Sequence, residues 1–142
     1  MPYALPADLQ DRYPDVRLAE LSDPTGAAVQ SARLQTALAD ASAEMDSYLG
    51  RRYFFPLASV PPILKRVCCD IAIYRLQALL PKETVADARR RFEDAITWLD
   101  DLATGRIFLP DLAGVELSSG PSVRVISTAA PRVFGSDAFG DY

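Results

Sequence analysis

Acidic side chains are the first candidates for catalysis in this sequence, because the chain contains no histidine to act as a general base or zinc ligand. Neighbouring carboxylates form three pairs, namely Glu44 with Asp46, Glu93 with Asp94, and Asp100 with Asp101. Acid–base or metal-assisted chemistry needs two carboxylates that face each other across a cleft. Residues one or two apart on a helix do not face each other. The pairs therefore indicate solvated helix faces, and we predict no catalytic, metal or cofactor site.

Asp70 differs from these pairs because it lies among apolar residues of a predicted helix. Arg66 lies four residues before it and Tyr74 four residues after it, so both are its neighbours on a helix. A buried carboxylate must find such partners or become neutral. Two interpretations are open, a catalytic or metal-binding carboxylate and a hydrogen-bonded structural one. Since no second ligand lies at a useful spacing, we expect Asp70 and Tyr74 to form a structural polar part of the core.

The sequence also lacks the motifs of other kinds of catalytic and binding site. The serines have no Gly-x-Ser-x-Gly elbow, and no glycine-rich phosphate loop is followed by a lysine. The adjacent residues Cys68 and Cys69 project about 100° apart on a helix, which disfavours a disulfide between them. We predict two buried thiols and a chain that is not an enzyme.

Composition narrows the function classes further. With 142 residues, about half of them apolar, the chain can form one domain with one core. A net charge of −4 gives no electrostatic footprint for nucleic acid. No stretch approaches the roughly 20 apolar residues that span a bilayer, and the first residues do not form a secretory signal. We expect no membrane partner, and synthesis in a cytoplasm.

Three segments repeat apolar residues every three or four positions, which predicts three amphipathic helices. They cover about 28–49, from 62 to Pro81, and about 83–103, with Gly50 and Gly105 placed to end the first and third. A short helix is expected between Leu5 and Pro14, followed by turn residues over 20–26. The predicted fold is mainly α, a small antiparallel helical bundle over residues 1–109.

The end of the chain has a different character. Residues 110–142 hold neither a helical period nor much charge, and we predict an extended C-terminal tail or β-hairpin. The hairpin would pair 115–117 with 123–126. Fully extended, the segment from Leu112 onward could reach roughly 100 Å, well beyond its own bundle.

An apolar loop joins the first two main helices. Tyr53, Phe54 and Phe55 follow two arginines in "SYLGRRYFFPLASVPP", residues 47–62, and three adjacent aromatics are costly in water. Together with the aromatic tail, this loop supplies the candidate interface residues. They are Arg51, Arg52, Phe54, Phe55, Arg132, Phe134, Phe139 and Tyr142.

Three segments in order carry a resemblance to a known family. They are "DASAEMDSYLGRRYFFPL" (40–57), the helix from Pro61 to Leu76 with "LKRVCCDIAIYRL", and "RRRFEDAITWLDDLATGRIFL" (89–109). The chain resembles the neck-protein family of Mu-like phages and prophages, which is similar in fold to the head–tail connector, or adaptor, proteins of long-tailed phages. The matching positions are Tyr48-Leu49, Arg52-Tyr53, Pro56-Leu57, 70–76, and Arg91-Phe92 through Gly105. Because Tyr53 and Leu57 match family positions, we expect them to close the end of the bundle, leaving Phe54 or Phe55 to face outward.

The resemblance implies a structural role without a cofactor. Such proteins form a ring, expected to be a dodecamer, below the portal protein at the virion neck. The ring extends the DNA channel and docks a stopper or tail-completion protein. DNA would pass without specific binding, which suits an acidic chain because a wall that repels phosphates does not retain them. The alternative is a small helical DNA-packaging or regulatory DNA-binding protein, which would need a basic recognition face.

Overall fold

The computed structural model describes residues 2–23, 25–77 and 85–112. Over these ranges it has helices α1 (Pro6–Gln10), α2 (Asp15–Ser22), α3 (Ser31–Leu49), α4 (Pro62–Gln77) and α5 (Val85–Ala103), followed by a 3₁₀ turn, η2 (Pro110–Leu112). The described part of the chain contains no β-strand, so the fold is mainly helical, as predicted. The predicted hairpin and the tail residues Arg132, Phe134, Phe139 and Tyr142 lie outside the described residues.

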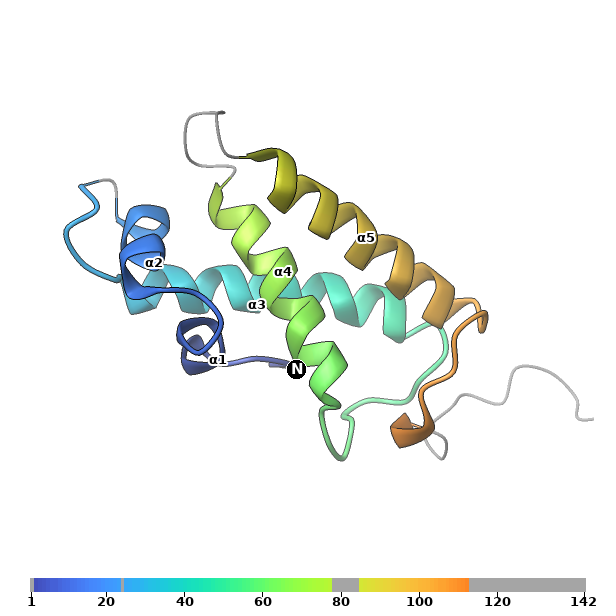
Figure 1. Cartoon of the computed structure of the whole chain (residues 1–142). Helices are drawn as coiled ribbons and strands as arrows, with labels where there is room; N and C mark the ends of the chain where they lie inside the picture. Colours follow the sequence, from blue (N-terminus) through green and yellow to red (C-terminus); the bar gives the residue numbers. More distant parts are fainter. Residues whose placement is uncertain (1, 24, 78–84, 113–142) are drawn as a thin grey trace, which may run out of the picture.

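Helix α4 is the centre of the structure. Figure 1 shows α4 crossing α3 and α5 running back alongside α4 in the opposite direction, while α1 and α2 cover the other side of the α3–α4 pair. Buried residues therefore occur around much of α4, among them Leu64, Val67, Ile71, Ile73 and Leu76. A helix that is packed by neighbours on several sides needs apolar residues on several faces.

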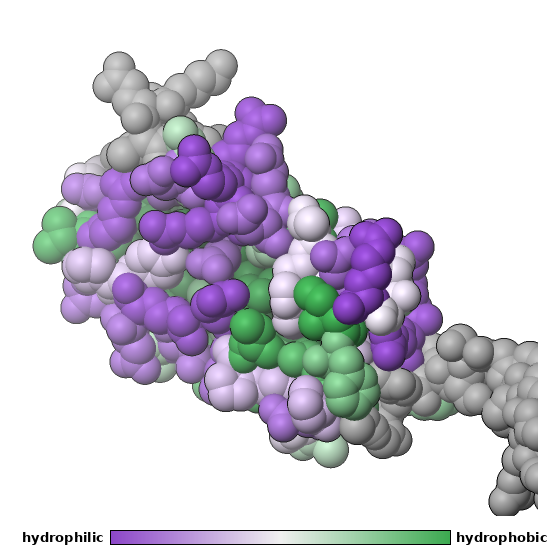
Figure 2. Space-filling model, turned by 45° about the vertical axis from the view of Figure 1, so that its right-hand side comes forward, coloured by the Kyte–Doolittle hydropathy of each residue, from purple (hydrophilic) through white to green (hydrophobic). Residues whose placement is uncertain are grey.

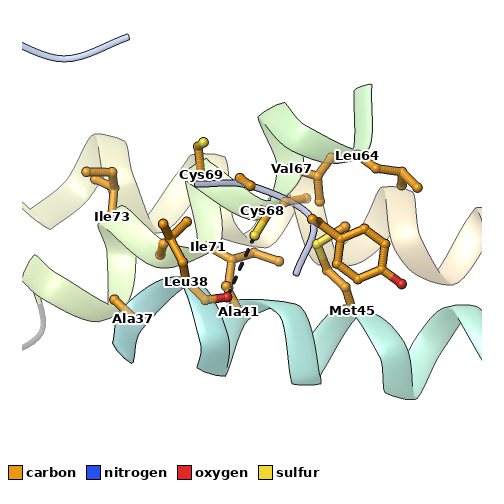
Figure 3. Close-up of a cluster of buried hydrophobic side chains, with 14 of the residues drawn as sticks. Ala37, Leu38, Ala41, Met45, Leu64, Val67, Cys68, Cys69, Ile71 and Ile73 are labelled. Carbon is orange, nitrogen blue, oxygen red and sulfur yellow. Dashed lines mark hydrogen bonds between the residues drawn. The ribbon is translucent and has the colours of Figure 1, made fainter. Parts of the chain in front are cut away.

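Helix α3 meets α4 through the stripe that its periodicity predicts. Its buried residues step by three or four positions and include Leu34, Leu38, Ala41, Met45 and Leu49. Figure 3 shows Leu38, Ala41 and Met45 on α3 directed toward the side chains of α4. This interdigitation of apolar side chains forms the main core.

The two thiols are buried in that core, as predicted. Cys68 and Cys69 are both free and fully buried, and Figure 3 shows their sulfur atoms pointing in different directions from α4. The Sγ atom of Cys68 lies 3.6 Å from Ser42 Oγ on α3. Burial raises the pKa of Cys68, and burial followed by the charge of Cys68 raises the pKa of Cys69 to about 12. Both sulfurs are therefore neutral packing groups near neutral pH.

The N-terminal segment contains one helix more than the sequence predicts. Residues after Pro14 form α2, which buries Leu18 and Leu21, and the turn follows from Asp23 onward. The Ser22 hydroxyl accepts a 2.9 Å hydrogen bond from the Gln30 amide, which links α2 to the residue before α3. Eight residues hold barely two helical turns, so periodicity gives little signal for such a helix.

The last described residues return to the bundle. Helix α5 ends at Ala103, and Gly105 follows with a φ of +81°, a backbone conformation that favours glycine. Leu112 in η2 is only 2% exposed and belongs to the hydrophobic core. The core thus includes one residue of the segment that the sequence analysis assigned to the tail.

Candidate interaction surface

The α3–α4 loop presents its aromatic side chains in opposite ways. Tyr53 and Leu57 are 1% and 6% exposed and join the core, which confirms the expectation that they close the bundle. Phe54 and Phe55 are 60% and 39% exposed. Both phenylalanines, rather than one of them, therefore face outward.

The two loop arginines bind the end of α5. Arg52 Nη1 donates a 3.4 Å hydrogen bond to the carbonyl oxygen of Leu102, one of the last carbonyls of that helix. Its guanidinium also lies 5.8 Å from the centre of the Tyr53 ring. Arg51 forms a 3.4 Å ion pair with Asp100, in which both side chains are well exposed. Arg52 thus positions the loop within the chain, while Arg51 remains accessible at its rim.

Phe108 adds a third exposed aromatic ring at this end of the molecule. It is 55% exposed and follows α5, in the segment that Figure 1 shows running beside the α3–α4 loop. We call Phe54, Phe55 and Phe108 the phenylalanine surface. Figure 2 shows a face of the molecule on which hydrophobic side chains gather between polar ones. Exposed aromatic rings of this kind are enriched at protein interfaces.

A second feature is an open groove of about 620 Å³ beside Asp70, between the α1–α2 link, α4 and α5. Its polar and aromatic lining consists of Arg12, Tyr13, Arg66, Asp70, Arg91, Asp94 and Trp98. A smaller hollow of about 190 Å³ shares Tyr13, Asp70 and Arg91 with it, and adds Arg17 and Asp87 to the lining. The two hollows together extend along α4 and α5, and we call them the arginine groove.

Asp70 lines both hollows of the arginine groove and is hydrogen-bonded there. The hydroxyl of Tyr13 donates to Asp70 Oδ1 at 3.4 Å, and Arg91 Nη1 donates to the oxygen of Tyr13 at 3.5 Å. Burial raises the pKa of Asp70, although the charges of Arg66 and Arg91 act in the opposite direction. Tyr74 instead stacks on Phe92, with ring centres 4.3 Å apart. Tyr13 is therefore the hydrogen-bonding tyrosine, a role that the sequence analysis assigned to Tyr74.

Asp70 thus has polar partners from α5 and the α1–α2 link, while its role stays a prediction. Within residues 2–23, 25–77 and 85–112, no group of three or more His, Cys, Asp or Glu side chains could hold a metal ion. In the same ranges, no helix is long and apolar enough to span a membrane. The groove and the phenylalanine surface present charged, aromatic and apolar side chains to solvent.

Sequence reasoning did not single out Tyr13, Trp98 or Phe108. One signal for the groove was present on α5, where Arg91, Ala95 and Trp98 recur at helical spacing on one face. The opposite wall depends on the α1–α2 link, and α2 was not predicted.

The described residues thus define a small helical-bundle protein with an exposed aromatic surface and a polar groove. The chain belongs to the family described as Bacteriophage Mu, Gp36, which matches residues 3–125. It is a protein of a Mu-like phage or prophage, as its resemblance to that group implied.

Two relatives illustrate the similarity. The chain is 45% identical over 87 residues to "Mu-like prophage FluMu protein gp36" of Haemophilus influenzae, across 61% of the chain and 59% of that protein. It is 40% identical over 108 residues to "Gene product J" of Escherichia phage Mu, across 75% of the chain and 74% of that protein. The match therefore spans less than two thirds of the Haemophilus relative.

Proposed function

We propose that this chain is a non-enzymatic structural protein of the virion, a head–tail connector that forms a ring below the portal. The membership of the Mu Gp36 family supports a phage role. The observation that carries the proposal is the exposure of Phe54 and Phe55 beside the buried residues Tyr53 and Leu57. The loop buries Tyr53 and Leu57 but presents two phenylalanine rings to solvent, and exposed apolar side chains grouped in this way are typical of interaction surfaces.

The geometry of a ring explains why several distinct surfaces are useful. In a closed ring each copy contacts the next through two different patches, so the two sides of one interface need not resemble each other. The phenylalanine surface would supply one patch, with Arg51 at its rim, where exposed charges govern specificity and association rate more than affinity. Further surfaces would contact the portal protein and the stopper or tail-completion protein.

The net charge of −4 is compatible with a DNA conduit. An acidic wall repels phosphates, so DNA can pass through the ring without being retained. In this proposal the protein is made in the bacterial host and is located at the virion neck.

Replacement of both exposed rings tests the proposal. We expect Phe54→Ser with Phe55→Ser to lower ring formation at least about tenfold, since exposed aromatic anchors commonly carry the largest shares of interface energy. The measurement is negative-stain imaging and light scattering of the purified full chain, alone and with the portal protein.

Val16→Ser provides a matched control. Val16 is 73% exposed on α2, so this substitution also replaces an exposed apolar side chain by serine. We expect rings to persist in this variant. A wild-type chain that stays monomeric at high concentration and does not bind the portal would contradict the connector function.

A further inference from the structure

We propose that the arginine groove binds the acidic, aromatic segment 135–142, "GSDAFGDY", of another copy of this chain. The inference rests on the self-association of the proposed function and names a contact that would join neighbouring copies.

Two guanidinium groups of the groove are available to a ligand. The side chains of Arg12 and Arg66 are exposed, and neither has a carboxylate within ion-pair distance in the described part of the chain. Arginines outside the groove, such as Arg75 and Arg106, are paired with acids of the same chain. On a chain with 19 acidic and 15 basic residues, unpaired arginines beside a groove are suited to an acidic partner.

The acids that line the groove do not remove its preference for an acidic partner. Asp70 accepts the hydrogen bond from Tyr13, and the charges of Arg66 and Arg91 act on its carboxylate. Asp94 lies exposed at the rim, on the same helix as Arg91. Arg12 and Arg66 therefore keep donors for an incoming carboxylate.

Aromatic residues give the groove a second kind of contact. Trp98 and Tyr13 are half-buried and line the groove together with the arginines. Both provide large apolar area on a rigid ring, while the Tyr13 hydroxyl is already bonded to Asp70 and Arg91. A phenylalanine placed between two acidic residues would match this lining.

Segment 135–142 has this composition at a useful spacing. Asp137, Phe139 and Asp141 occur at every second position. In an extended peptide such residues point to the same side, about 7 Å apart. One face of the segment would therefore present an acid, an aromatic ring and another acid in order.

The connecting chain is long enough for contact between copies. Residues 113–134 separate the buried Leu112 from the segment, and when extended they span roughly 70 Å. Ring closure requires each copy to offer one surface and to accept a different one. A segment that leaves one bundle and enters the groove of the next meets that requirement.

Photo-crosslinking in the full chain tests the assignment. Phe139 is replaced by p-benzoylphenylalanine, and equal amounts of ¹⁵N-labelled and unlabelled protein are mixed before irradiation. We expect mass spectrometry to find crosslinks between labelled and unlabelled chains that map to α4 and α5 around Arg66 and Trp98. Crosslinks confined to single chains, or to residues outside the groove, would overturn the proposal.

Charge reversal separates specific binding from chance contact. Arg12→Glu with Arg66→Glu should lower the crosslink yield about fivefold or more, because two attractions become repulsions. Asp137→Arg with Asp141→Arg in that variant should restore it. Arg33→Glu is the matched control, since Arg33 is exposed on α3, outside the groove, and also has no ion pair among the described residues. A yield that does not respond to these charges would overturn the proposal.

Two further readouts complete the test. Salt-dependent binding of a short DNA duplex to the wild type but not to Arg12→Glu with Arg66→Glu would assign the groove to nucleic acid and overturn the peptide proposal. Rings in negative stain without the crosslink would overturn the groove assignment and leave the connector function standing. Crosslinks without rings or portal binding would support the groove and count against the connector function.

Discussion

At the scale of single residues, Asp70 shows how a carboxylate in an apolar helix obtains polar partners from other parts of the chain. Its hydrogen bond comes from Tyr13, and Arg91 in turn donates to Tyr13, so one chain of polar contacts links α5, the α1–α2 link and α4. Burial nevertheless raises the pKa of Asp70. The folded state therefore favours the protonated form more than the unfolded state does.

Asp70→Asn should consequently raise the free energy of unfolding at pH 7, by an amount within about 1 kcal/mol. Asparagine keeps an oxygen for the Tyr13 hydroxyl and removes the charge that is unfavourable when buried. Because the pKa of Asp70 is higher in the folded state, its protonation stabilises the fold fully at a pH below the unfolded pKa, about 3.9. This stabilisation is lost as the pH rises through the folded pKa. Urea unfolding at pH 7 and pH 3 measures the change, and the variant's advantage should disappear at pH 3. A large loss of stability at pH 7 would contradict this account.

Because its two thiols are buried, the folded protein should lose stability at alkaline pH. Burial raises the pKa values of Cys68 and Cys69 in the folded state, while unfolded thiols titrate near 8.5. Above that pH the unfolded state binds fewer protons, so stability should fall by up to about 1.4 kcal/mol per pH unit for each thiol. Thermal unfolding between about pH 8 and 9 measures the slope, because unfolded tyrosines, with a pKa near 10, are still about nine-tenths protonated at pH 9. Cys69→Ala should unfold with a shallower pH dependence, and an unchanged slope would refute the assignment.

At the scale of elements, the end of α5 and the α3–α4 loop hold each other in place. Gly105 adopts a φ of +81°, and a Cβ atom there would lie 2.5 Å from Arg52 Nη1. That guanidinium is the group that donates to Leu102. The glycine therefore supplies both the turn after α5 and the space for the arginine that fixes the loop.

Gly105→Ala should destabilise the protein by about 1–2 kcal/mol through the left-handed backbone alone, and by more if Arg52 is displaced. Gly26→Ala is a matched control, because Gly26 has a φ of +65° but no heavy atom within 4 Å of the added Cβ. It should show the backbone cost only. Chemical unfolding of both variants gives the comparison, and equal losses would show that contact with Arg52 does not matter.

At the scale of the whole molecule, the bundle and the following chain meet at Leu112. This residue is buried in the core, whereas Pro110 and Asp111 before it are exposed. The core therefore continues to Leu112, and the part of the chain proposed for assembly follows it. Truncation on either side of Leu112 should therefore have different effects on stability.

A chain ending at Leu112 should unfold cooperatively near the wild-type midpoint but assemble poorly, because it lacks segment 135–142. A chain ending at Leu109 should be less stable by about 1.5–3 kcal/mol, the value of burying one leucine side chain. Circular dichroism during urea unfolding, with light scattering for assembly, measures both effects. If the chain ending at Leu112 is unfolded, residues beyond 112 are part of the core.

The sequence alone determined the main helices and the state of the cysteines. Apolar residues at steps of three and four predicted α3, α4 and α5, because a long helix must turn one stripe toward the core. The adjacency of Cys68 and Cys69 on such a helix predicted two separate thiols. These features depend on neighbours in sequence, so local spacing is sufficient to find them.

Only the tertiary structure decided how the exposed features are arranged. Phe54 and Phe55 both face outward, in a loop that Arg52 links to the end of α5. The arginine groove likewise exists because folding brings Tyr13 beside Asp70, 57 positions later in the chain. Such contacts are set by the packing of distant segments, whereas sequence periodicity reports only which face of each segment is apolar.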